Sequence, residues 1–116
     1  MKIYVCGKIS NLPLEEVEEK FRSSVRKLLE ARIPNENIVN PLDIVPDNSS
    51  WEQAMEICLR ELQHCDAIYI QRDWRNSIGA KKEITFSQKT RKILLWEESN
   101  DLDCLINEPP VEKMDT

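Results

Sequence analysis

A chain of 116 residues is long enough to form one hydrophobic core and too short for two. Hydrophobic residues make up 41% of it and charged residues 32%, as in an ordinary soluble globular protein. The formal net charge of −5 argues against a nucleic-acid binder, because no basic surplus exists to neutralise phosphates. The sequence shows no signal peptide and no apolar run of membrane-spanning length, so we expect a cytoplasmic protein without a membrane partner.

The cysteines are widely spaced and form no Cys-x-x-Cys pair: Cys6, Cys58, Cys65 and Cys104. Three of them fall in apolar stretches, where free buried thiols are common. This pattern is untypical of a disulfide framework or a zinc site. We therefore expect no metal and no cofactor.

The chain begins with an apolar segment, residues 2–6, that predicts a first strand. Gly7 follows directly and permits a sharp turn, or a close approach of the backbone to a ligand. Pro13 is suited to open a helix. Acidic residues gather near the start of this helix and basic residues near its end, and its apolar stripe is Val17, Phe21, Val25, Leu28 and Leu29.

Residues 34–37 break this helix, and residues 38–39 predict a short second strand. A loop rich in Pro, Asp and Asn then leads to Ser50. Residues 50–53 have the form of a capping box and begin a second helix. Its apolar residues recur at helical spacing and are predicted to be core: Trp51, Ala54, Met55, Cys58, Leu59 and Leu62.

Residues 67–70 form a short apolar run typical of a buried parallel strand, and residues 91–96 predict a fourth strand. The alternation of strands and helices predicts an α/β protein, a Rossmann-like or flavodoxin-like three-layer sandwich with a parallel sheet of four or five strands. We expect one domain over residues 1–108. A short helix or strand is predicted at residues 102–106, and a flexible tail at residues 109–116.

The segment that follows the third strand is where we expect a ligand. A polar loop leads to Ser77, which is placed as the N-cap of a third helix. A strand, a loop and a helix N-terminus in this order put a ligand at the carboxyl edge of a parallel sheet, where the free N–H groups of the helix favour an anion. Glu83 lies about one and a half turns further along and suits a carboxylate facing the same crevice.

Three stretches resemble the nucleoside 2-deoxyribosyltransferase superfamily: residues 3–10 (IYVCGKIS), 65–69 (CDAIY) and 77–83 (SIGAKKE). Two branches are most similar. One is the DUF4406 group of small proteins, whose pattern residues 40–41 and 74–83 follow. The other is the deoxynucleoside-monophosphate N-glycosidase branch, which shares the forms Ile-Tyr-x-Cys-Gly-x-Ile and Ser-x-Gly-x-x-x-Glu. The resemblance covers residues 2–95.

The resemblance implies a deoxyribosyltransferase or N-glycosidase that cleaves the N-glycosidic bond of a nucleoside or nucleotide. Glu83 would attack the anomeric carbon, whose oxocarbenium-like transition state a carboxylate can stabilise or capture. Asp66 would help to protonate the leaving base or hold the sugar, and Tyr4 would orient the nucleophile. The predicted substrate-binding residues are Gly7, Ser77, Ile78 and Gly79, together with Asp73 and Trp74 in the loop over the site.

Each of these residues also has a structural interpretation. Glu83 would be a solvated helix residue, Asp66 a helix cap or the start of a strand, and Tyr4 a core residue. Trp74 would either stack on a base or pack against its own loop. A local basic cluster would either attract a phosphate or form surface salt bridges: Arg72, Arg75, Lys81 and Lys82.

The alternative function is a non-catalytic nucleotide-binding protein that senses or sequesters its ligand in the same crevice. In both cases the expected partner is a small-molecule nucleoside or nucleotide and not a nucleic acid. Because the relatives that the resemblance implies are dimers or larger, we expect a homo-oligomer, with the helix of Trp51 or that of Glu83 in the interface.

Overall fold

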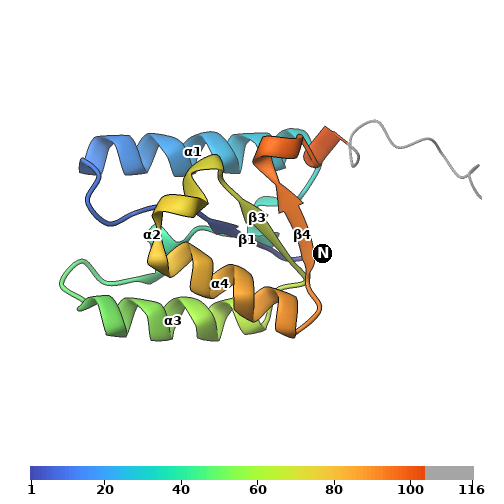
Figure 1. The fold of residues 1–116 in the computed structure, drawn as a ribbon. Helices are drawn as coiled ribbons and strands as arrows, with labels where there is room; N and C mark the ends of the chain where they lie inside the picture. The colour runs from blue at the N-terminus through green and yellow to red at the C-terminus, as the bar shows by residue number, and fades with distance from the viewer. Residues whose placement is uncertain (104–116) are drawn as a thin grey trace, which may run out of the picture.

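A four-stranded sheet forms the centre of the computed structural model, which describes residues 1–103 (Figure 1). Its strands are β1 (Ile3–Cys6), β2 (Ile38–Val39), β3 (Ala67–Ile70) and β4 (Ile93–Trp96). They lie in the order β2-β1-β3-β4, and each neighbouring pair is parallel. The predicted α/β sandwich with a parallel sheet is therefore confirmed. The predicted tail at 109–116 and most of the predicted element at 102–106 lie outside the described residues.

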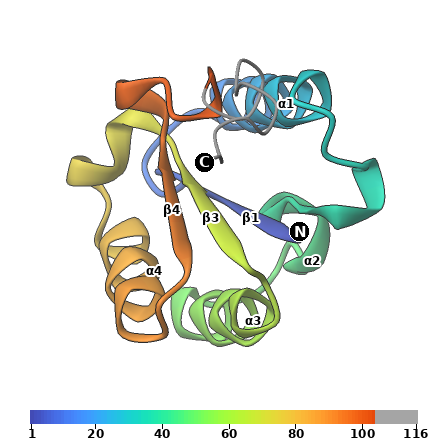
Figure 2. The same ribbon diagram turned by 90° about the vertical axis from the view of Figure 1, so that its right-hand side faces the viewer.

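Helices cover both faces of the sheet. α1 (Leu14–Glu30) lies on one face, and α3 (Trp51–Gln63) and α4 (Ile78–Lys89) lie on the other (Figures 1 and 2). Short 3-10 turns complete the connections: η1 (Asn35–Asn37), η2 (Arg72–Asn76) and η3 (Glu97–Ser99). Within residues 1–103, no helix combines the length and the apolar character that crossing a membrane requires.

The helix starts follow their local sequence signals. Ser50 and Gln53 form the predicted capping box, in which each side chain binds the backbone N–H of the other residue. The Ser77 hydroxyl accepts a hydrogen bond from the Ala80 N–H at 3.0 Å, so the predicted N-cap of α4 is confirmed as well.

One further helix, α2 (Pro41–Ile44), replaces the first part of the predicted loop. The side chain of Asn40 accepts a hydrogen bond from the Leu42 N–H at 3.0 Å, and Pro41 occupies the first helical position. An Asn cap followed by proline is a good helix start, and a single turn is too short to show an apolar period. The expectation of a continuous loop was therefore wrong at these residues.

The strands divide the core into two clusters, because successive side chains of a strand point to opposite faces of the sheet. Ile3, Val5, Ala67 and Tyr69 pack with residues of α1, including Phe21. Tyr4, Cys6, Ile68 and Ile70 pack with residues of α3 and α4, including Leu62 and Ile84. Tyr4 therefore faces the helix that carries Glu83.

Trp51 departs from the predicted core of α3. Cys58 and Leu62 are buried, but the Trp51 side chain is 43% exposed. A helix of 13 residues is about 20 Å long, whereas strands of four residues span about 13 Å. The first turn of α3 therefore extends past the sheet, and the prediction that Trp51 is a core residue was wrong.

Candidate functional site

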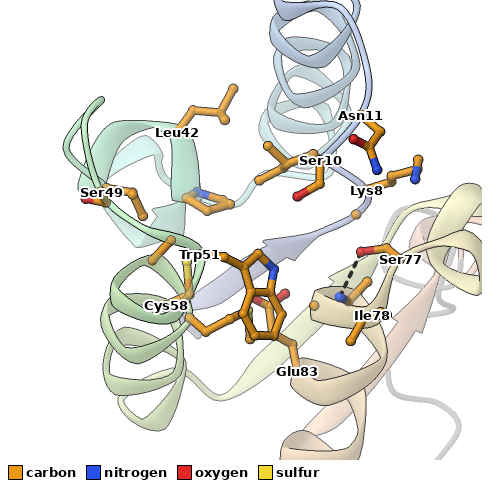
Figure 3. A pocket seen from close by; sticks show the side chains of 18 of the residues that line it. Lys8, Ser10, Asn11, Leu42, Ser49, Trp51, Cys58, Ser77, Ile78 and Glu83 are labelled. Carbon is orange, nitrogen blue, oxygen red and sulfur yellow. Dashed lines mark hydrogen bonds between the residues drawn. The ribbon is translucent and has the colours of Figure 1, made fainter.

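A pocket of about 560 Å³ opens at the carboxyl end of β1. Its walls come from the loop after β1, from α2 and the residues after it, and from the first turns of α3 and α4 (Figure 3). The chain changes face here, since α1 leads from β1 to β2 over one face and α3 leads from β2 to β3 over the other. In open α/β sheets, such a switch point is where ligands bind.

Glu83 lines this pocket although it is only 6% exposed. Its Oε2 atom accepts a hydrogen bond from the Tyr4 hydroxyl at 2.7 Å. Burial raises the pKa of the Glu83 carboxyl to about 7, because the charged form loses its hydration, while hydrogen bonds from Tyr4 and Cys6 act in the opposite direction. The interpretation of Glu83 as a solvated helix residue is therefore wrong.

Tyr4 is both a core residue and a pocket residue. Its ring is fully buried in the cluster between the sheet and α3 and α4, and its hydroxyl reaches Glu83. Burial, and then the nearby Glu83 carboxylate, raise the pKa of Tyr4 well above its ordinary value. Burial also raises the pKa of Cys58, which lies beside the Tyr4 hydroxyl, to about 11. Tyr4 and Cys58 are thus both neutral at pH 7, and Tyr4 is a fixed hydrogen-bond donor to Glu83.

The N-terminus of α4 forms another wall of the pocket. Ser77, Ile78 and Gly79 all line it, and Figure 3 shows the hydrogen bond by which Ser77 caps the helix. Within residues 1–103, the N–H groups of Ile78 and Gly79 have no hydrogen-bond acceptor. The Lys8 ammonium donates to the Asn76 carbonyl at 3.0 Å, next to this turn. Free N–H groups, the positive end of a helix and a lysine together favour an anion here.

Each glycine of the site allows a close contact within the protein. A Cβ on Gly7 would lie 1.8 Å from Oε1 of Gln71, which is buried and donates from its amide nitrogen to Ser24 at 2.9 Å. A Cβ on Gly79 would lie 3.1 Å from the Met55 sulfur, so the missing side chain lets α4 approach α3. Gly7 also lines the pocket, but its close contact is with the Gln71 side chain.

Asp66 lies at the opposite edge of the sheet. It precedes β3, and its carboxylate accepts a hydrogen bond from the Lys2 N–H at 2.8 Å, next to the start of β1. The pocket lies at the carboxyl end of the same strands. The structure therefore does not bring Asp66 to Glu83, because the full length of β3 separates the two edges.

Asp73 does not line the pocket but fastens two of the segments around it. Its carboxylate accepts from the Lys8 N–H at 3.2 Å and from the Lys20 ammonium at 2.6 Å. The same ammonium donates to the Lys8 carbonyl at 2.6 Å. The structure gives Asp73 a positioning role, since it joins η2 to the loop after β1.

Trp74 also lies outside the pocket lining. Its ring packs against Trp96, with 5.4 Å between centroids, and under the Arg75 guanidinium at 4.6 Å. Two residues of the basic cluster form ion pairs on the surface, Arg75 with Glu98 at 2.8 Å and Arg72 with Glu97 at 3.9 Å. The structure thus favours the packing interpretation of Trp74 and the salt-bridge interpretation of these two arginines.

Several pocket residues were missed in the sequence: Lys8, Ser10, Asn11 and Trp51. One signal was available for Trp51. A residue in the first turn of a helix that returns to a parallel sheet lies at the carboxyl edge, where ligands bind. Only the tertiary structure shows that the loop of Lys8, Ser10 and Asn11 faces α3 and α4 across the pocket (Figure 3).

A family model described as "Domain of unknown function (DUF4406)" matches residues 1–96 of this chain. The matched range contains the whole sheet and every residue that lines the pocket. Comparisons with curated proteins and with solved structures gave no match.

Proposed function

The chain belongs to the DUF4406 family, and we propose that it is an N-glycosidase or deoxyribosyltransferase for a nucleoside or nucleotide, with Glu83 as nucleophile. One observation carries the proposal. A buried carboxylate, oriented by a tyrosine hydroxyl, lines a pocket that also contains the N-terminus of the same helix. From Ile78 to Glu83 the rise along α4 is about 8 Å, which suits one sugar phosphate between the two.

Glu83 would act in two steps. Its carboxylate attacks the anomeric carbon, the bond from that carbon to the base nitrogen breaks, and the departing base takes a proton from solvent. A covalent sugar ester of Glu83 results. Water, or a second base, then attacks the anomeric carbon, releases the carboxylate and passes its proton to solvent. The hydrogen bond from Tyr4 fixes the carboxylate and favours its charged form.

The second wall of the pocket supports a substrate that carries a phosphate. The N–H groups of Ile78 and Gly79, the Ser77 hydroxyl and the Lys8 ammonium would share the phosphate charge. A deoxynucleoside monophosphate would therefore bind more tightly than the corresponding nucleoside.

One observation favours the second candidate, a non-catalytic nucleotide-binding protein. The acid predicted to assist the leaving base, Asp66, lies at the far edge of the sheet. Of the acidic residues among 1–103 that line the pocket, Glu18 and Asp47 are exposed and only Glu83 is buried. If departure of the base requires a second acid in contact with it, and not a proton from solvent, the same pocket would hold a nucleotide and leave it intact.

A product assay separates the two functions. The protein is incubated with a panel of deoxynucleosides and their monophosphates, and free base is measured by chromatography. Glu83→Gln keeps the shape of the side chain and is expected to reduce base release by roughly a thousandfold or more, because it removes the nucleophile. Glu16→Gln, which changes an exposed carboxylate outside the pocket lining, is the control and should retain activity.

Equal base release by the wild type and Glu83→Gln would refute the mechanism. If the wild type releases no base but binds nucleotides in calorimetry, the protein is a nucleotide-binding protein. If it neither releases base nor binds, both candidates are wrong.

A further inference from the structure

We propose that Trp51 recognises the base, as a platform on which the base of a bound nucleotide stacks. The inference depends on the proposed function for the class of ligand. It concerns a residue outside every motif that suggested that function.

Trp51 is exposed where a ligand would cover it. It lines the pocket and is 43% exposed, whereas the other two tryptophans pack against each other. The capping box of Ser50 and Gln53 fixes the turn of α3 from which Trp51 extends. A large aromatic ring on a fixed backbone loses little conformational entropy when a base stacks on it.

The position of the indole fits a base attached to a sugar beside Glu83. A Cβ built on Gly79 would lie 3.9 Å from the indole nitrogen, so Trp51 lies against the first turn of α4. Gly79 and Glu83 are four residues apart and share one face of α4, with about 6 Å between their side-chain origins. Figure 3 shows that Trp51 and Glu83 both point into the pocket. An anomeric carbon in contact with Glu83 would therefore place its base within reach of the indole.

The surroundings of Trp51 favour stacking over reading of the base edge. Apolar residues predominate on this side of the pocket: Leu42, Val45, Pro46, Ala54 and Met55. Every base has a π face, so stacking on an indole is tolerant of base identity. We expect the site to discriminate only modestly among the four bases.

A second copy of the chain would also explain an exposed tryptophan. Leu14 and Ile78 line the same pocket and are 69% and 70% exposed, so a partner surface could cover all three side chains. The test therefore measures the affinity for a ligand that carries a base, the affinity for a ligand that lacks one, and the oligomeric state.

Calorimetry with two probes gives the comparison. The probes are a deoxynucleoside monophosphate and deoxyribose 5-phosphate, which lacks the base. Trp51→Leu should weaken binding of the nucleotide roughly 10- to 100-fold and leave binding of the sugar phosphate unchanged. Trp51→Phe, which keeps an aromatic face, should retain most of the nucleotide affinity. Leu29→Ala, at an apolar residue that is equally exposed (43%) but lies outside the pocket lining, is the matched control and should affect neither probe.

Three results would overturn the proposal. The first is an equal loss of affinity for both probes in Trp51→Leu. The second is a wild type that binds the nucleotide no more tightly than the sugar phosphate. The third is unchanged nucleotide affinity together with conversion of an oligomer to a monomer in light scattering, which would assign Trp51 to a subunit interface. Calorimetry measures affinity and not base release, so the role of Trp51 can be tested even if the protein binds nucleotides without cleaving them. Catalysis is tested separately by the chromatographic assay.

Discussion

Replacing Glu83 with glutamine is expected to stabilise the folded protein at alkaline pH. The Glu83 side chain is 6% exposed, and burial raises the pKa of its carboxyl from 4.5 to about 7. The folded protein thus binds this proton more tightly than the unfolded chain does. The contribution of Glu83 to stability is therefore fully present below pH 4.5 and is lost as the pH rises to about 7.

The size of the effect follows from the two pKa values. A tenfold change in proton affinity corresponds to about 1.4 kcal/mol, so the interval from 4.5 to about 7 corresponds to about 3 kcal/mol. Glutamine has the same shape, carries no charge, and its amide oxygen can still accept the hydrogen bond from Tyr4. Glu83→Gln should therefore be about 3 kcal/mol more stable than the wild type at pH 8, and close to it at pH 4.5. For a domain of this size, that gain raises Tm by about 10 °C.

Urea unfolding followed by circular dichroism at several pH values measures the difference directly. The wild type should lose stability relative to Glu83→Gln between pH 4.5 and 7, and the difference should be constant above pH 8. Glu18→Gln makes the same change at an exposed residue of the same pocket and is the control for the substitution itself. A Glu83→Gln variant that is less stable than the wild type at pH 8 would refute the reasoning, since it would show that the charged form is stabilised by its surroundings.

Three further predictions concern the same structure. The rate of base release should rise with pH through about 7, where Glu83 ionises. Tyr4→Phe should move this midpoint upward, because it removes a hydrogen bond that lowers the pKa of the Glu83 carboxyl. A flat pH profile would contradict the role of Glu83. Gly7→Ala should lower the free energy of unfolding by about 1–3 kcal/mol in urea, because its Cβ would lie 1.8 Å from Gln71 Oε1. The double variant with Gln71→Ala should lose less stability than the sum of the two single variants. Simple additivity would mean that the two residues do not clash. The protein should be a homo-oligomer in light scattering at micromolar concentration, and a monomer there would refute the expected assembly.

The features predicted correctly depend on short segments of sequence. The bounds of β2 and β3, the capping box at Ser50 and the N-cap at Ser77 each follow from a few neighbouring residues. The alternation of strands and helices then leaves few topologies, because crossover connections between parallel strands are right-handed. The approach of Tyr4 to Glu83 was implied by the resemblance alone; in the structure it arises because alternate residues of β1 face α4.

The positions of the residues that were predicted wrongly depend on the lengths of helices and strands and on the edges of the sheet. No local sequence pattern determines these. Trp51 satisfied the apolar period of α3, but it lies on a turn that extends beyond four-residue strands. Trp74 lies in the loop over the site, yet its ring packs on Trp96, which is 22 positions further along the chain. Asp66 differs from both. Because it directly precedes β3, the sequence alone already predicted that it lies at the amino edge of the sheet. There, the resemblance to a catalytic pattern was given more weight than the polarity of the strand.

The two sides of the pocket differ in how they are held, and this bears on how a ligand is accommodated. Tyr4 is fully buried in the middle of β1, with strands paired on both sides, so its hydroxyl cannot move without disturbing the sheet. Glu83 is fixed to that hydroxyl and to α4. The facing wall is a loop without strand pairing, and it is attached through partly buried polar contacts of Asp73 and Lys20. We therefore expect adjustment to different ligands to occur in that loop while the carboxylate keeps its position, as the role proposed for Glu83, a nucleophile aimed at one carbon atom, requires.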